Sequence, residues 1–306
     1  MKIPIVLVTG FLGSGKTTFL RQIAEANPDW RLIFLVNEFS ETSIDEKVLA
    51  STGTPTQSVA GGSLFCECKA GEFLRVMRET VLPAHRANPL DAVIVETSGT
   101  ANPDAIGRLI LDHGLSEQFV LHRIVSIVAP LSFQKLVRNL PVLDSQIRCS
   151  DLIVINKTDT VDEATLQAVE EEIRLHNKDA TLVQAQHCKT PFALTRSLRR
   201  LPQGELSTCD ANPFATVSVD WPEERSIDDA HRWLEGLPAS VLRVKGRIRT
   251  SDGFWQIERT VDSTDIVSIS QDGVSTASTL VLIAHEDHES ILEEAAINLQ
   301  KSSTHA

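Results

Sequence analysis

The feature that most constrains this 306-residue sequence is a glycine-rich loop, Gly10-Phe-Leu-Gly13-Ser-Gly15-Lys16-Thr17. The loop follows a continuous apolar run over residues 3–9 and precedes residues 16–26, whose apolar side chains recur at helical spacing. A strand, a G-x-x-x-x-G-K-T loop and a helix in this order are typical of a phosphate-binding loop. The sequence therefore predicts that backbone N–H groups and a helix N-terminus bind the phosphates of a nucleotide.

The loop and the first helical turn supply the predicted phosphate contacts. Lys16 is expected to reach the β- and γ-phosphates, and Thr17 to offer its hydroxyl to Mg²⁺. The alternative, a glycine turn without a ligand, is disfavoured by the flanking strand and helix. The residues predicted to bind the nucleotide here are Gly10, Gly13, Ser14, Gly15, Lys16, Thr17 and Thr18.

A second motif, Asn156-Lys157-Thr158-Asp159, follows another apolar run. The carboxylate of Asp159 can accept hydrogen bonds from both N–H donors of guanine, a pair that adenine does not offer. Asn156 is expected to brace the base-binding loops, and the stem of Lys157 can cover the face of the base. The motif therefore predicts GTP and GDP as ligands, and the alternative is an aspartate that caps a helix.

A third segment, Glu96-Thr97-Ser98-Gly99, ends the apolar run over residues 91–96. Glu96 is expected near the Mg²⁺ and its waters, and Gly99 can bring its N–H to the γ-phosphate; the alternative is a solvated carboxylate at a strand end. An acid or a backbone group must position the attacking water, and no arginine finger is evident, so we expect slow turnover. The candidate catalytic residues are Lys16, Thr17, Glu41, Asp45 and Glu96.

Strand and helix signals alternate over the first two hundred residues. The predicted strands cover residues 3–9, 31–37, 91–96, 123–129 and 151–156, and the predicted helices cover residues 16–26, 72–81 and 162–176. Buried parallel strands appear in a sequence as continuous apolar runs. The alternation therefore predicts an α/β domain over residues 1–200, with a doubly wound, mostly parallel sheet.

The pattern changes after a turn-rich stretch at residues 201–213, which we interpret as a linker. Strands are predicted at residues 214–221, 241–250, 253–261 and 279–284, and helices at residues 227–237 and 286–299. These elements predict a small C-terminal α+β domain over residues 214–306.

Charge and hydropathy exclude two classes of partner. The net charge is −12, and residues 201–306 carry 18 acidic residues against 8 basic ones. Proteins that bind nucleic acid usually present a basic surface, so we expect no nucleic-acid partner. The apolar runs are far shorter than the ~20 residues of a membrane helix, and no cleavable leader is expected before the loop. We therefore expect a cytoplasmic protein with no membrane partner.

Two of the five cysteines are spaced as metal ligands. Cys66 and Cys68 stand two residues apart, and an odd, sparse set of cysteines is a poor disulfide framework. Thiolates suit Zn²⁺ and related ions, but two of them cannot fill a tetrahedral site. Glutamates or an exchangeable ligand from a partner must complete the site, and the alternative is that Cys66 packs in the core. The candidate metal residues are Thr17 for Mg²⁺, and Cys66, Cys68, Glu38 and Glu41 for a transition metal, with Glu67 and Glu72 as further candidates.

Together these motifs resemble the CobW-like family of GTPases, relatives of the urease and hydrogenase nickel-insertion GTPases. The matching segments also include residues 37–45, residues 96–103, Gln146-Ile147 and the stretch from Leu242 to Gly246. The resemblance implies a Rossmann-like P-loop GTPase domain and GTP hydrolysis coupled to metal delivery or metallocofactor assembly. It implies a client metalloprotein or cofactor-assembly enzyme as partner and leaves open a homo-oligomer.

Zn²⁺ is the favoured metal, with Co²⁺ and Ni²⁺ as alternatives. The competing hypothesis is a nucleotide-gated regulatory switch with structural cysteines. The chain departs from the family pattern at Lys69, which replaces the last thiol. It also departs just after the fourth predicted strand, where the family often has an aspartate and this chain has Val128-Ala129-Pro130. The positive charge of Lys69 is expected to lower the pKa of the neighbouring thiols and to repel a cation.

Overall fold

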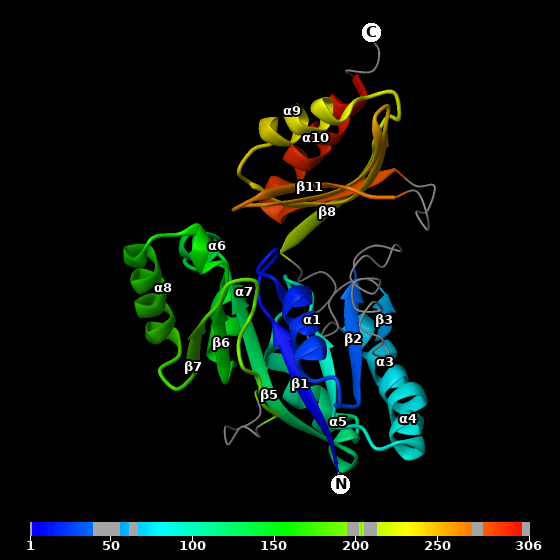
Figure 1. Cartoon of the computed structure of the whole chain (residues 1–306), viewed down its shortest axis with the longest axis vertical. Helices are drawn as coiled ribbons and strands as arrows, with labels where there is room; N and C mark the ends of the chain where they lie inside the picture. The colour runs from blue at the N-terminus through cyan, green and yellow to red at the C-terminus, as the bar shows by residue number, and fades with distance from the viewer. Residues whose placement is uncertain are drawn as a thin grey trace. The chain divides into compact units, whose positions relative to one another are not determined.

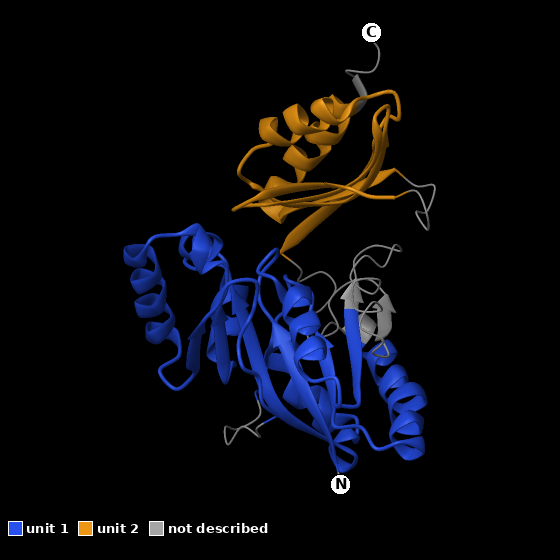
Figure 2. Cartoon of the chain, viewed as in Figure 1, with its two compact units in different colours: residues 1–211 blue, residues 212–306 orange. Residues whose placement is uncertain are grey.

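A computed structural model describes residues 2–38, 56–60, 67–194, 202, 204, 213–270 and 278–301; at residues 37–38, 56–60, 67–69 and 300–301 it describes the backbone only. The chain divides into two compact units, Met1–Ala211 and Asn212–Ala306 (Figure 2). Most of the predicted linker, residues 201–213, lies outside the described residues.

Among the described residues, the strands of unit 1 form a seven-stranded sheet in the order β3-β2-β4-β1-β5-β6-β7, and every pairing between these strands is parallel (Figure 1). This confirms the predicted α/β class. The chain extends from β1 to one side and later returns to the other, so the loop after β1 lies at the topological switch point, where ligands bind in such sheets. The strands are β1 (Ile3–Thr9), β2 (Leu32–Glu38), β3 (Thr56–Ala60), β4 (Ala92–Glu96), β5 (Phe119–Val128), β6 (Leu152–Ile155) and β7 (Thr181–Gln184).

Helices cover both faces of this sheet. In β1, Ile5 and Leu7 pack in a core with side chains of α3 and α5, whereas Val6 and Val8 pack in a second core with α1. Burial on both faces explains why β1 is a continuous apolar run rather than an alternating one. The α-helices in the described part of unit 1 are α1 (Lys16–Ala26), α3 (Glu67–Val76), α4 (Leu82–Ala87), α5 (Ile106–Asp112), α6 (Pro130–Leu136), α7 (Pro141–Arg148) and α8 (Glu163–His176).

Several boundaries in unit 1 differ from the prediction. The helix expected over residues 72–81 begins at Glu67 and passes through a π-helical turn, Met77–Val81, into α4. The strand expected from residue 123 begins at Phe119. The strands β3 and β7 were not predicted, because they lie at the two edges of the sheet and contain polar residues instead of an apolar run.

Unit 2 has a five-stranded antiparallel sheet in the order β11-β10-β9-β12-β8, which confirms the predicted small α+β domain. Side chains from the sheet and both helices form one core. The short strand β11 was not predicted. The elements are β8 (Phe214–Asp220), α9 (Ile227–Gly236), β9 (Val241–Thr250), β10 (Gly253–Thr260), β11 (Thr264–Ser268), β12 (Thr279–His285) and α10 (Glu289–Lys301). None of the described helices of either unit is both long and apolar enough to cross a membrane.

Candidate functional site

Two glycines of the loop after β1 occupy positions that no larger residue fits. Gly10 has a φ of 136°, and a Cβ there would collide with the carbonyl oxygen of Ile127. Gly15 has a φ of 108°, and a Cβ there would lie 2.5 Å from Nδ2 of Asn156. Left-handed backbone and close packing both require glycine, so the loop is held tightly between β5 and the end of β6.

Positive charge gathers at this loop. The Lys16 ammonium donates hydrogen bonds to the carbonyl oxygens of Gly10 at 2.9 Å and Phe11 at 3.1 Å, and it therefore lies over the loop. The first turn of α1 contains no acidic residue of its own, and the carboxylate of Glu96 approaches it at Thr17. Phosphate oxygens that enter the loop would meet both the ammonium and this helix end.

Thr17 and Glu96 lie close together between α1 and β4. The Thr17 hydroxyl donates to Oε1 of Glu96 at 3.3 Å, and Oε2 lies 3.5 Å away. Glu96 is only 5% exposed and ends β4, which pairs with β1 through the register Val8↔Glu96. A hydroxyl and a carboxylate are the oxygen ligands that Mg²⁺ takes in proteins, so these two residues fit that ion.

The segment after β4 packs against the phosphate loop. A Cβ at Gly99 would lie 2.7 Å from the backbone nitrogen of Leu12, so this contact requires glycine. The side-chain amide of Gln146, in α7, donates to the carbonyl oxygens of Gly99 at 3.1 Å and Ala101 at 3.2 Å. Gln146 was not predicted as a site residue, although its segment was part of the family resemblance.

Asn156 joins the second motif to the phosphate loop. Its Nδ2 donates to the carbonyl oxygen of Ser14 at 2.9 Å, and its Oδ1 accepts from the backbone N–H of Cys188 at 2.8 Å. The side chain is 3% exposed. Asp159 lies in the exposed turn that follows, so its carboxylate is accessible to a ligand. Asn156 therefore connects the turn after β6 with the loop of residues 10–17 and with the loop after β7.

Cys188 completes this packing, and no sequence motif marks it. The residue is fully buried, has a φ of 56°, and places its thiol 3.3 Å from the carbonyl oxygen of Gly15. Burial raises the pKa of the thiol to about 12, and the charge of Lys157 lowers it by a smaller amount. The thiol is therefore protonated and acts as a packing and donor group.

The predicted transition-metal residues fall largely outside the described part of the chain. Glu41 and Cys66 lie outside the described residues, as does the catalytic candidate Asp45. For Glu38 and Cys68 only the backbone is described, at the end of β2 and in α3. Within the described residues, no group of three or more His, Cys, Asp or Glu side chains could hold a metal ion.

The chain is similar in sequence to one family of nucleotide-binding proteins. The family model described as "CobW/HypB/UreG, nucleotide-binding domain" matches residues 4–184. The zinc chaperone YeiR of Escherichia coli (strain K12) is 27% identical over an alignment of 331 residues that covers 97% of this chain and 98% of YeiR. The zinc chaperone YjiA of the same organism is 26% identical over 264 residues, covering 80% of this chain and 81% of YjiA.

Among solved structures, a Zn(II)-bound triple mutant of the YjiA GTPase covers 98% of this chain, and the match spans 99% of that protein. The sequence identity is 21% and the TM-score is 0.50. At this identity the likeness concerns the fold.

Proposed function

Because the chain belongs to the CobW/HypB/UreG family of nucleotide-binding proteins, we propose that it is a GTPase that uses GTP hydrolysis to deliver a transition metal to a client protein. The observation that carries the nucleotide part is the Asn156 side chain, which joins the turn of residues 156–159 to the phosphate loop through Ser14 and to the loop after β7 through Cys188. The relatives named zinc chaperones support the metal part.

Each end of the nucleotide has its own residues. The phosphates bind in the loop of residues 10–18, where the Lys16 ammonium leaves the carbonyls of Gly10 and Phe11 for phosphate oxygens. The exposed carboxylate of Asp159 accepts the two N–H donors of guanine. GDP should therefore bind much more tightly than ADP, and equal affinities would contradict the guanine assignment.

Hydrolysis depends on the side of the loop that faces β4. Thr17 and Glu96 would hold Mg²⁺, which when bound would neutralise charge that develops on the β- and γ-phosphates. Gly99, which packs against Leu12 of the phosphate loop, would offer its backbone N–H to the γ-phosphate. Glu96, Glu41 and Asp45 remain the candidates that position the attacking water.

The topology of the sheet supports a metal site next to the nucleotide. In the β2–β3 pair, Glu38 lies in register with Ala60 at the carboxyl ends of both strands. Glu41 follows Glu38 by three residues and Cys66 follows Ala60 by six. A chain spans at most about 3.5 Å per residue, so these side chains can reach a common ion. We favour Zn²⁺ as the cargo, with Co²⁺ and Ni²⁺ as alternatives.

The test is metal binding to the reduced full-length protein with a non-hydrolysable GTP analogue, with GDP and without nucleotide. Zn²⁺, Co²⁺ and Ni²⁺ are titrated into the wild type, Cys66→Ser and Cys68→Ser. Cys149→Ser is the matched control, because Cys149 is a half-buried thiol at the end of α7. Tight binding that requires Cys66 and Cys68 but not Cys149, and that shifts with nucleotide, supports the proposal. Binding that ignores both thiols would favour the regulatory switch with structural cysteines.

A further inference from the structure

A small cavity lies behind the phosphate loop, between the loop, β5 and α7. Its apolar wall includes Phe11, Phe133 and Leu143, and its volume is about 10 Å³. A cavity of this size accommodates about one water molecule, provided that two to four polar groups face it.

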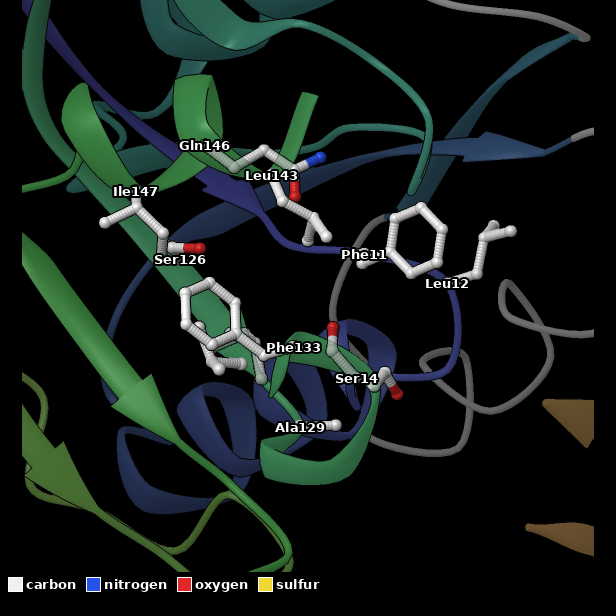
Figure 3. Close-up of a pocket in the computed structure, with 12 residues that line it drawn as sticks. Phe11, Leu12, Ser14, Ser126, Ala129, Phe133, Leu143, Gln146 and Ile147 are labelled. Carbon is white, nitrogen blue, oxygen red and sulfur yellow. The ribbon is translucent and has the colours of Figure 1, made fainter. Parts of the chain in front are cut away.

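Three polar atoms line this cavity without a hydrogen-bond partner among the described residues. They are Oγ of Ser14 in the phosphate loop, Oγ of Ser126 in β5 and Oε1 of Gln146 in α7. Each of the three residues is only 1% exposed. Figure 3 shows them on different sides of the same space, among the apolar residues that close it. Buried polar atoms are almost always paired, so three orphans around one water-sized space indicate a missing common partner.

We propose that this cavity binds one ordered water molecule that joins the phosphate loop to Gln146. The hydroxyls of Ser14 and Ser126 donate to the water oxygen, and the water donates to Oε1 of Gln146. These three hydrogen bonds lie within the range of a typical buried water. The water site depends on the side chains of Ser14 and Ser126, because alanine at either position would remove one hydrogen-bond partner of the water.

The water gives Gln146 a positioning role in hydrolysis, a step that rests on the proposed GTPase function. One end of its amide holds the carbonyls of Gly99 and Ala101, and the other end faces the water shared with Ser14. The backbone of Gly99 and Ala101, the segment expected to face the γ-phosphate, is therefore tied to the phosphate loop through one side chain and one water. Loss of either the water or the Gln146 amide should slow GTP hydrolysis more than it weakens nucleotide binding.

The first test is a high-resolution crystal structure of the full chain. The wild type should show one water within hydrogen-bond distance of all three atoms. The double variant Ser14→Ala/Ser126→Ala should show a dry cavity, because a single remaining partner cannot hold a water. A dry cavity in the wild type, a bound ion, or direct pairing of the three atoms with protein groups would overturn the proposal. This test is independent of GTP hydrolysis.

The second test separates positioning from stability. Ser126→Ala should lower kcat about two- to five-fold, which corresponds to the loss of about one hydrogen bond. Gln146→Met should lower kcat more than ten-fold, with the affinity for GDP within two-fold of wild type. Leu143→Ala is the matched control, because Leu143 lines the same cavity from the same helix and has no polar atom in its side chain. It should lower the melting temperature and leave kcat within two-fold.

The outcomes distinguish the two proposals. If Leu143→Ala lowers kcat as much as Gln146→Met, Gln146 has only a structural role and its positioning role is wrong. If the wild type shows no GTP turnover at all, the proposed function fails, and the crystal structure still decides whether the water is present.

Discussion

Replacement of Asn156 by alanine should weaken both the fold and nucleotide binding. The truncation removes the partner of two buried backbone groups, the carbonyl of Ser14 and the N–H of Cys188. One of these groups belongs to the phosphate loop and the other to the loop after β7. The variant therefore removes the link that joins the turn containing Asp159 to the phosphate loop and to the loop after β7.

The magnitude follows from the two unpaired groups. A buried backbone donor or acceptor that loses its partner costs about 1–3 kcal/mol, so an upper limit is about 6 kcal/mol. Water that enters the truncated space recovers part of this cost. We therefore expect the free energy of unfolding of unit 1 to fall by about 2–4 kcal/mol. The affinity for GDP should fall at least ten-fold, because the loops proposed to bind the phosphates and the base are no longer held in fixed positions relative to each other.

The assay compares Asn156→Ala with Asn177→Ala. Asn177 is a matched control: it is also buried, it donates to the carbonyls of Ile147 at 2.7 Å and Ser150 at 2.9 Å, and it accepts from the N–H of Ala180 at 3.1 Å. Denaturant unfolding measures stability, and isothermal titration measures GDP affinity at a temperature where both variants are folded. Both variants should lose stability, but only Asn156→Ala should lose affinity. Equal GDP affinity in the two variants would refute the bracing role.

Three further predictions test other parts of the site. Asp159→Asn should weaken GTP binding and shift the nucleotide preference toward xanthosine nucleotides. An unchanged preference for guanosine nucleotides would contradict the assignment of Asp159 to the guanine base. Gly99→Ala should lower the hydrolysis rate and the melting temperature, because its Cβ would lie 2.7 Å from the nitrogen of Leu12; wild-type kinetics would contradict the close approach. The pKa of Cys188 is raised from 9.0 to about 12, so the unfolded chain loses this proton first as the pH rises. The free energy of unfolding should consequently fall above pH 9 by about 1.4 kcal/mol per pH unit, and Cys188→Ala should lack this contribution. If the wild type and Cys188→Ala showed the same dependence of stability on pH, burial of the thiol would be contradicted.

The central strands could be predicted because their burial on both faces produces a continuous run of apolar residues in the sequence. A strand such as β1, packed on both faces, must be apolar at every position, and the run over residues 3–9 matches its observed bounds. The edge strand β3 contains Thr, Gln and Ser, so its sequence carries no such signal. Its pairing with β2 depends on a long-range register that a local pattern does not encode.

The candidate site likewise has parts that a local sequence pattern predicts and parts that depend on long-range contacts. The loop of residues 10–17 and the turn at Asn156 are local motifs whose spacing encodes their shape, so both could be located from the sequence. Gln146 and Cys188 act on residues 47 and 173 positions away, through hydrogen bonds to Gly99 and Gly15. Only the fold brings these partners together: the family resemblance included the segment of Gln146 without giving its contacts, and no motif marks Cys188.

The strand order also bears on how nucleotide and metal would communicate. From β1, which leads into the phosphate loop, the sheet continues through β4 to β2 and β3, whereas the base-binding turn follows β6 on the other side. Glu96 ends β4, and Glu38 ends β2, the next strand. Under the proposed function, the metal residues are therefore neighbours of the γ-phosphate side and distant in strand order from the base. Metal loading should consequently change kcat for GTP and leave GDP affinity nearly constant, since GDP lacks the γ-phosphate. A metal that altered GDP affinity as strongly as kcat would place the coupling at the base side and contradict this reasoning.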